Sequence, residues 1–258
     1  MSQDDARAQT DVVMASIRSM IRDGELRAGD RLPPEKDLGA RLAVSRGSLR
    51  EGVRALAALG ILETRQGDGT YVTPLDARRL LQPVGVLAEL VSDVDARHLL
   101  TVRRAIEAES AALAATHAST DDVAALHDAL DDVARLLADD APLADLLAAD
   151  SRFHRLVAAA SGNPALAALV DQLVVRTLRP RLDRAATEHG AVVASLDEHR
   201  DVLAAIERRD PERARLHMQV HLLGVEDYVD GTAEPVTGPG RPGPPAQARP
   251  DAQARDDQ

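Results

Sequence analysis

Three stretches of the sequence place polar residues that could bind a metal on otherwise apolar helix faces. Asp150 and His154 lie on a stripe of apolar residues that recurs every three or four positions from Leu143 to Val157, and His199 and His221 occupy the same place in two later stripes. Asp150 and His154 are four residues apart, so on a helix they face the same side. One carboxylate and three imidazoles suit Zn²⁺ and are also acceptable to Ni²⁺, Mn²⁺ or Fe²⁺. The chain has no cysteine, so any metal must be held by oxygen and nitrogen atoms.

These histidines have an ordinary alternative role, because a histidine on an apolar face is more often a hydrogen-bonded member of the core. The spacing leaves both roles open, since it does not show that the three stripes converge. His217 is a rival ligand four residues before His221, although Met218 fits the stripe better. A metal-dependent enzyme is a further alternative. Four protein ligands leave little of a tetrahedral ion open, and the stripes carry no separate general base, so we expect no enzyme.

A second group of residues could bind nucleic acid. Arg46, Arg50 and Arg54 recur every four positions after Ser45, whose hydroxyl can cap a helix. The apolar or small residues expected to pack inward from the neighbouring face are Leu49, Gly52, Val53, Leu56 and Leu59. Guanidinium groups bind phosphates or pair with guanine, and the free N–H groups at the helix start, near Ser45 and Ser48, can bind a phosphate. A solvated row of arginines is the ordinary alternative.

The elements around this helix indicate a winged helix-turn-helix. Apolar spacing predicts a first helix over residues 10–22, and Pro34 is suited to open a second one. The helix that starts at Ser45 is followed by a hairpin over residues 61–73 with a Gly-rich turn. Short helices joined by a turn and followed by such a hairpin are typical of DNA readers.

The rest of the chain predicts a separate helical domain. Residues 83–231 give six or seven amphipathic helices, one of which Pro180 should kink or break. We therefore expect a mainly α-helical protein with a DNA-binding domain over 1–75, a linker over 76–82 and an all-helical ligand-binding bundle over 83–231. The last 27 residues, 232–258, contain six prolines and are expected to be disordered.

The net charge of −11 at first disfavours a nucleic-acid binder. The charge is uneven, however, because residues 1–75 are neutral while residues 76–231 carry −10. A neutral first domain can still present one basic face. The sequence has no apolar run of about 18 residues and no basic, apolar leader, so we expect a cytoplasmic protein without a membrane segment.

The N-terminal residues also carry the motifs of a known family. Residues 10–74 contain G-x-L-x-x-G-x-x-L-P-x-E, V-S-R-x-x-L-R-E, L-x-x-L-G-I and G-x-G-T-Y-V, and they resemble the DNA-binding domain of the GntR superfamily of bacterial regulators. The residues that this resemblance implies as DNA contacts are Lys36, Ser45, Arg46, Ser48 and Arg50, with Gln66 and Gly67 of the wing in the minor groove. Lys36 stands where the family more often has arginine. Gly52 stands where alanine is usual, at a cost of about 1 kcal/mol of helix propensity.

The helical region resembles the FCD effector domain of the FadR branch of that superfamily over residues 83–224. The matching segments are DSRFHRLVAAASGNPAL and EHRDVLAAIERRDPERARLHMQVHL. In metal-binding members these positions hold the cation, which implies Asp150, His154, His199 and His221 as ligands here. The resemblance also implies that Arg103, within LLTVRRAIEAESAALAA, pairs with the carboxylate of an effector.

Together these observations predict a ligand-responsive transcriptional regulator, with the repressor sign taken from the family. A small organic acid bound at a divalent metal, with Zn²⁺ as the first choice, would control the affinity for operator DNA. A regulator that responds to the metal alone is the alternative. The resemblance and the pairing of half-sites by helix-turn-helix proteins imply a homodimer.

Overall fold

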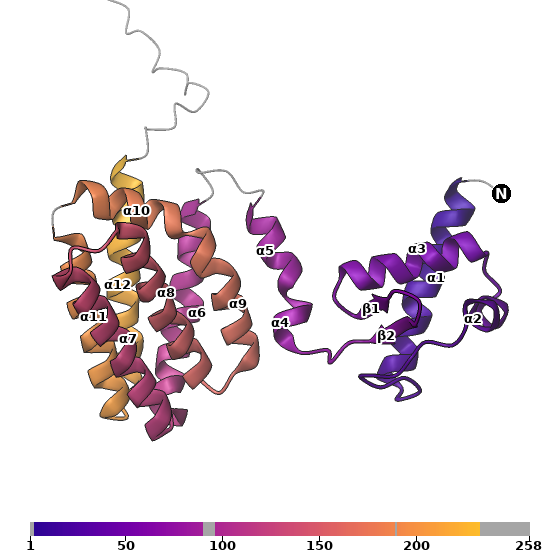
Figure 1. The fold of residues 1–258 in the computed structure, drawn as a ribbon, viewed down its shortest axis with the longest axis horizontal. Coiled ribbons are helices and arrows are strands. Elements are labelled where there is room, and N and C mark those ends of the chain that lie inside the picture. Colours follow the sequence, from indigo (N-terminus) through magenta and orange to yellow (C-terminus); the bar gives the residue numbers. More distant parts are fainter. Residues whose placement is uncertain (1–2, 90–95, 189, 233–258) are drawn as a thin grey trace, which may run out of the picture.

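The computed structural model describes residues 3–89, 96–188 and 190–232 of the 258-residue chain. The N-terminal domain begins with helices α1 (Gln3–Arg22), α2 (Glu35–Leu42) and α3 (Arg46–Ala58). An antiparallel hairpin follows, in which β1 (Leu62–Arg65) pairs with β2 (Gly69–Val72). The prediction of a winged helix-turn-helix is confirmed (Figure 1).

One apolar core holds the N-terminal domain together. The buried side chains of this core are Val13, Ile17, Met20, Leu26, Leu32, Leu38, Leu49, Leu56, Leu62 and Val72. They come from all three helices and both strands, so the angle between the hairpin and α3 is set by a shared core. The hairpin register pairs Leu62 with Val72 and Arg65 with Gly69, which leaves the turn at the tip of the wing.

Helix α3 begins and ends close to the predicted positions. The Ser45 hydroxyl accepts a hydrogen bond from the Ser48 N–H at 3.1 Å, as expected for an N-cap. At the other end Gly60 adopts a φ of 73°, which favours glycine and terminates the helix. The prediction that Leu59 packs inward is wrong, because Leu59 is the C-cap residue, beyond the last helical turn, and is 42% exposed.

Two short helices connect the N-terminal domain to the bundle. The segment predicted as a linker, 76–82, contains α4 (Ala77–Leu80) and the start of α5 (Gln82–Glu89). Both helices pack against α9 (Pro164–Arg176) (Figure 1). Arg78 of α4 lies 3.1 Å from Asp171 of α9, and Arg79 of α4 lies 2.7 Å from Glu63 of the wing. The connection therefore makes ion pairs with both domains.

The C-terminal domain is an all-helical bundle, as predicted. In the described part of the chain its helices are α6 (Ala96–His117), α7 (Thr120–Ala138), α8 (Leu143–Ala160), α9, α10 (Leu178–Thr187), α11 (Ala191–Glu207) and α12 (Pro211–Thr232). Helix α8 lies inside the bundle, with contacts to α6, α7, α9 and α10. Phe153 and Val157 of α8 belong to the main core. The two stripes that carry His199 and His221 also face this core, on α11 and α12.

The break predicted at Pro180 occurs one turn earlier. Helix α9 ends at Arg176, and Thr177 separates it from α10. A proline ring clashes with the carbonyl four residues before it, so a single helix through this region is disfavoured. No helix in the described residues is long and apolar enough to cross a membrane. The tail predicted to be disordered lies, from residue 233 onward, outside the described residues.

Candidate metal centre and nucleic-acid interface

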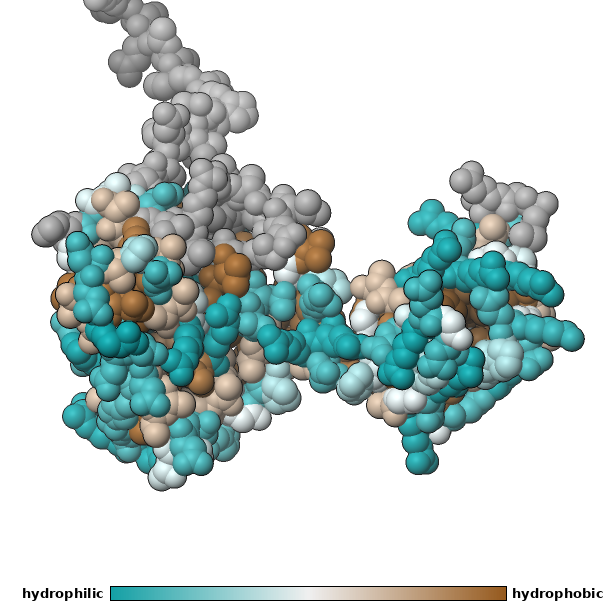
Figure 2. Space-filling model, viewed as in Figure 1, coloured by the Kyte–Doolittle hydropathy of each residue, from teal (hydrophilic) through white to brown (hydrophobic). Residues whose placement is uncertain are grey.

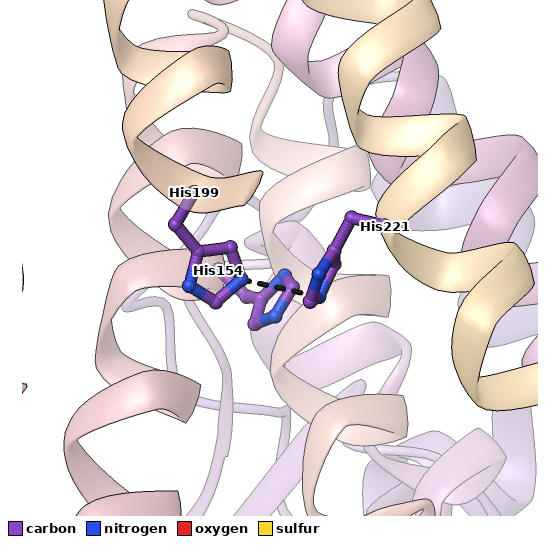
Figure 3. A group of neighbouring side chains, drawn as sticks. All are labelled: His154, His199 and His221. Atoms are coloured by element: carbon purple, nitrogen blue, oxygen red, sulfur yellow. Dashed lines mark hydrogen bonds between the residues drawn. The ribbon is translucent and has the colours of Figure 1, made fainter. Parts of the chain in front are cut away.

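Three buried histidines from three helices meet in the centre of the bundle (Figure 3). His154 comes from α8, His199 from α11 and His221 from α12, and each is 1% exposed. One ring nitrogen from each lies within 4.8 Å of the others. The Nε2 atoms of His199 and His221 are 3.1 Å apart. The convergence that sequence spacing left open is therefore present.

Burial favours the neutral form of His199 and His221. Burial, followed by the neighbouring His221, lowers the pKa of His199 well below 6.5. Burial also lowers the pKa of His221 to about 4, although Glu198 acts in the opposite direction. Neutral imidazoles carry free lone pairs, which is the form that binds a cation.

Asp150 lies beside the three histidines but also contacts an arginine. Its Oδ2 is 3.6 Å from His154 Nε2, and its Oδ1 is 3.7 Å from His199 Nδ1. The same carboxylate forms an ion pair with Arg181 of α10. The close three-residue group therefore consists of histidines, with Asp150 at its edge, paired to a buried cation. His217, the rival ligand, is half-buried and outside this group.

A buried carboxylate joins the histidines to Arg103. Glu107 Oε2 lies 2.5 Å from His154 Nδ1, and its Oε1 accepts a hydrogen bond of 2.6 Å from Arg103 Nε. Arg103, which is 0% exposed, also donates to the hydroxyl of Thr177. Burial acts to raise the pKa of Glu107, but the charges and hydrogen bonds of Arg103 and His154 outweigh burial and lower this pKa. Glu107 is therefore ionised.

A second carboxylate orients another histidine of the group. His221 Nδ1 lies 2.8 Å from Glu198 Oε2. Carboxylates that bind one ring nitrogen leave the other nitrogen directed at a metal, and such partners tune metal affinity. Within the described residues, the buried atoms His154 Nε2 and Arg103 Nη2 have no hydrogen-bond partner. Three converging imidazoles, two carboxylates that contact their ring nitrogens and an unbonded imidazole nitrogen fit a divalent cation.

Sequence reasoning missed three residues of this centre. Glu107 stands four residues after Arg103 on an apolar helix, and this spacing of opposite charges was a usable signal. Glu198 and Arg181 carried no such signal, because their neighbours in the fold come from other helices. Burial, followed by the charge of the nearby Arg103, lowers the pKa of Arg181 to about 9, although Glu107 acts in the opposite direction. Two buried guanidiniums thus lie near each other beside the histidines.

The centre is connected to a small hollow. A space of about 30 Å³ between α8, α10, α11 and α12 is lined by Asp150, Arg181, Val192, Ser195 and Val225, among others. This volume is about that of one water molecule. Entry of a larger ligand requires movement of the surrounding helices.

Most of the predicted DNA-contacting residues are exposed, and the face of the N-terminal domain seen in Figure 2 is largely hydrophilic. The exposed ones are Lys36, Arg46, Arg50, Gln66 and Gly67, to which Arg54 can be added. Arg50 forms an ion pair with Glu35 at 3.0 Å. A hollow of about 740 Å³, lined among others by Arg31, Glu35 and Gly67, separates α3 from the wing.

The two predicted serines are placed differently. Ser45 is half-buried, and its hydroxyl is used as the N-cap of α3. Ser48 is 3% exposed, and its hydroxyl lies 2.9 Å from that of Ser45 and 3.2 Å from Gln9 Oε1. In this structure the side chain of Ser48 is therefore used inside the domain. Gln9 also accepts a hydrogen bond from the Ser45 N–H, a role that nothing in the sequence indicated.

Comparisons with known proteins agree with both halves of the structure. The profile of the FCD domain matches residues 98–224, and that of the bacterial regulatory proteins of the gntR family matches residues 9–72. The HTH-type transcriptional regulator LutR of Bacillus subtilis is 33% identical over 219 residues, which cover 83% of this chain and 98% of LutR. A putative L-lactate dehydrogenase operon regulatory protein of Escherichia coli is 36% identical over 121 residues, 45% of this chain and 46% of that protein. The solved structure of Streptococcus agalactiae GntR has a TM-score of 0.60 at 27% identity, and covers 84% of this chain and 99% of its own.

Proposed function

The chain is a member of the GntR family with an FCD domain, a DNA-binding transcriptional regulator, and from this premise we propose that a small carboxylate bound at its metal centre controls its affinity for operator DNA. The matched families and relatives are transcriptional regulators and not enzymes. The observation that carries the proposal is the convergence of three buried imidazoles next to the buried Arg103.

His154, His199 and His221 would hold the metal, with Asp150 as the fourth ligand once it leaves Arg181. Zn²⁺ fits this set best, and Ni²⁺, Mn²⁺ or Fe²⁺ are acceptable. The bound metal would supply a positive centre that attracts a carboxylate oxygen.

Arg103 would bind the carboxylate of the effector. Its Nε and Nη1 atoms are held by Glu107 and Thr177, which leaves Nη2 without a hydrogen bond among the described residues. A guanidinium fixed in this way can bind a carboxylate at low entropic cost. A relative named for the L-lactate dehydrogenase operon makes L-lactate the first effector to test.

The bundle offers a continuous set of contacts from this site to the wing. Thr177 follows the last residue of α9, and Asp171 of the same helix pairs with Arg78 of α4. The next residue, Arg79, pairs with Glu63 of the wing. A movement of α9 on effector binding would therefore change the position of the wing, and the repressor sign means that the effector releases the DNA.

The DNA would be read by the exposed face of α3 and by the wing. Arg46, Arg50 and Lys36 would contact phosphates or base edges, and Gln66 with Gly67 would enter the minor groove. Ser45 and Ser48 would contribute backbone N–H groups at the start of α3. The functional unit would be a cytoplasmic homodimer that binds a two-fold operator.

One observation favours a second candidate function, in which the metal itself is the effector. The hollow that reaches Asp150 has only about 30 Å³, enough for water or an ion. Operator affinity would then respond to the metal in the absence of any organic acid.

Metal content tests the site directly. We expect about one metal ion per chain in the wild-type protein and much less in His199→Ala. His217→Ala is the matched control, because His217 lies four residues before His221 but outside the group, and it should retain the metal. Equal metal content in wild-type and His199→Ala protein would contradict the assignment of these histidines as metal ligands. A change in operator affinity produced by L-lactate in the metal-loaded protein, with none produced by the metal alone, would support the carboxylate effector over the metal as effector.

A further inference from the structure

Helix α12 is apolar on two opposite faces. Its inner face packs in the core through Ala214, Met218, Leu222 and Val225. Its outer face carries Leu216, Val220 and Leu223, which are 56%, 51% and 38% exposed. A helix that is apolar on both sides is normally covered on both sides, so the outer face lacks a cover in the single chain.

The spacing of this outer face matches a helix–helix seam. Arg213, Leu216, Val220, Leu223 and Asp227 follow one another at steps of three, four, three and four residues, the repeat of a coiled-coil contact. The three central residues are apolar, and the two outer ones are exposed and of opposite charge. Arg213 and Asp227 are each seven residues from Val220, about 10 Å along the axis on either side.

We propose that this seam, Arg213 to Asp227, packs antiparallel against the same seam of a second copy of the chain, with the two helices crossing at Val220. The charges of Arg213 and Asp227 favour a second copy of the chain as the partner and an antiparallel orientation of the two helices. In an antiparallel pair Arg213 faces the partner's Asp227 at both ends, whereas a parallel pair places like charges against each other. The seam is thus complementary to itself only under a two-fold axis through Val220.

The neighbouring helix α6 contacts α12 near the end of the seam. Arg104 of α6 bonds Glu226 of α12 at 3.1 Å, which places the outer side of α6 next to the end of the seam. Val102 on α6 is 48% exposed. Helix α12 would therefore carry the metal-ligating His221 on its inner side and a dimer contact at the adjacent Val220, so that metal binding and subunit packing share one helix.

This inference rests on the proposed two-fold reader, but its test uses no DNA and no metal, so the two can fail separately. In sedimentation equilibrium of the full chain we expect a dimer whose dissociation constant rises at least about tenfold in Val220→Glu. Val193→Glu is the matched control, because Val193 on α11 is 53% exposed and outside the seam. Arg213→Glu and Asp227→Arg alone should each weaken the dimer, and the double exchange should restore it. A monomeric wild-type chain, or a double exchange no better than the singles, would overturn the proposal.

A cross-linking experiment locates the axis. The chain has no cysteine, so Val220→Cys introduces the only thiol. A short bis-maleimide should link two copies of this variant in high yield, and Val193→Cys should give little dimer. A dimer by sedimentation that cross-links at residue 193 but not at 220 would place the interface elsewhere. Wild-type operator binding in that case would leave the proposed function standing.

Discussion

Replacement of Glu107 by glutamine should weaken both the bundle and its metal binding. The carboxylate is 1% exposed and uses one oxygen on His154 and the other on Arg103. In Glu107→Gln the guanidinium of Arg103 loses its buried counter-charge and keeps Thr177 as a partner. Breaking a buried ion pair in this way costs about 3–5 kcal/mol of stability. Because the amide oxygen of glutamine can still accept a hydrogen bond from Arg103, we expect a loss near the lower value.

The second effect of Glu107→Gln is a lower affinity for the metal. Glutamine no longer fixes His154 with its Nε2 directed at the group, and loss of such a partner lowers metal affinity by about 10–100-fold. Glu198→Gln is the matched comparison, since Glu198 orients His221 in the same way but is 31% exposed and pairs with no arginine among the described residues. It should lower metal affinity by a similar factor while costing less than about 1 kcal/mol of stability.

Two measurements on each variant separate these effects. Urea unfolding of the chelator-treated protein gives the free energy of unfolding, and competition with a chromogenic chelator gives the metal dissociation constant. Metal-free Glu107→Gln protein that is as stable as the wild type would refute the stabilising role of Glu107. Wild-type metal affinity in both variants would refute the role of the two carboxylates in metal binding.

Three further outcomes are expected. In the metal-free protein the free energy of unfolding should fall as the pH drops from 6.5 towards 4, because His221 is protonated more readily in the unfolded chain. The folded-state pKa of about 4 corresponds to a loss of about 3 kcal/mol of stability. Urea unfolding of His221→Gln should show a shallower pH dependence than that of the wild type. Gly52→Ala should destabilise the N-terminal domain by about 1–3 kcal/mol despite its better helix propensity, because a Cβ there would lie 2.6 Å from Val13 Cγ1. Thermal unfolding should show partial recovery of stability when Val13→Ala is added. An unchanged or raised melting temperature for Gly52→Ala alone would contradict this packing. Arg46→Ala and Arg50→Ala should each lower operator affinity and reduce the slope of its logarithm against log salt by about one, and slopes equal to the wild type in both variants would remove these residues from the DNA interface.

Helical spacing predicted which helix faces carry the candidate metal ligands. Asp150, His154, His199 and His221 interrupt apolar stripes, and a buried polar group in such a stripe must find a partner. Whether the partner is a metal or another side chain depends on how α8, α11 and α12 pack, which one helix at a time does not determine. Arg181 was missed for that reason, since its contact with Asp150 exists only after the helices assemble.

The N-terminal domain shows the same division between local and long-range information. Ser45 and Gly60 act locally, so the limits of α3 were predictable. The hydroxyl of Ser48 lies 3.2 Å from Gln9 Oε1. Local spacing could not predict this contact, because Gln9 is 39 residues earlier in the chain. Gly52 is explained by the close approach of Val13, whereas the resemblance identified only a departure from the usual alanine.

Control of operator affinity by a carboxylate at the metal centre can be measured on the DNA complex itself. It is tested most directly by fluorescence anisotropy of a duplex selected with the purified, Zn²⁺-loaded protein, titrated with and without L-lactate and a panel of small hydroxy- and dicarboxylic acids. At least one acid should weaken wild-type binding several-fold and leave the affinity of His199→Ala unchanged. An acid that acts equally on both proteins, or no response to any acid in the wild type, would contradict the claim.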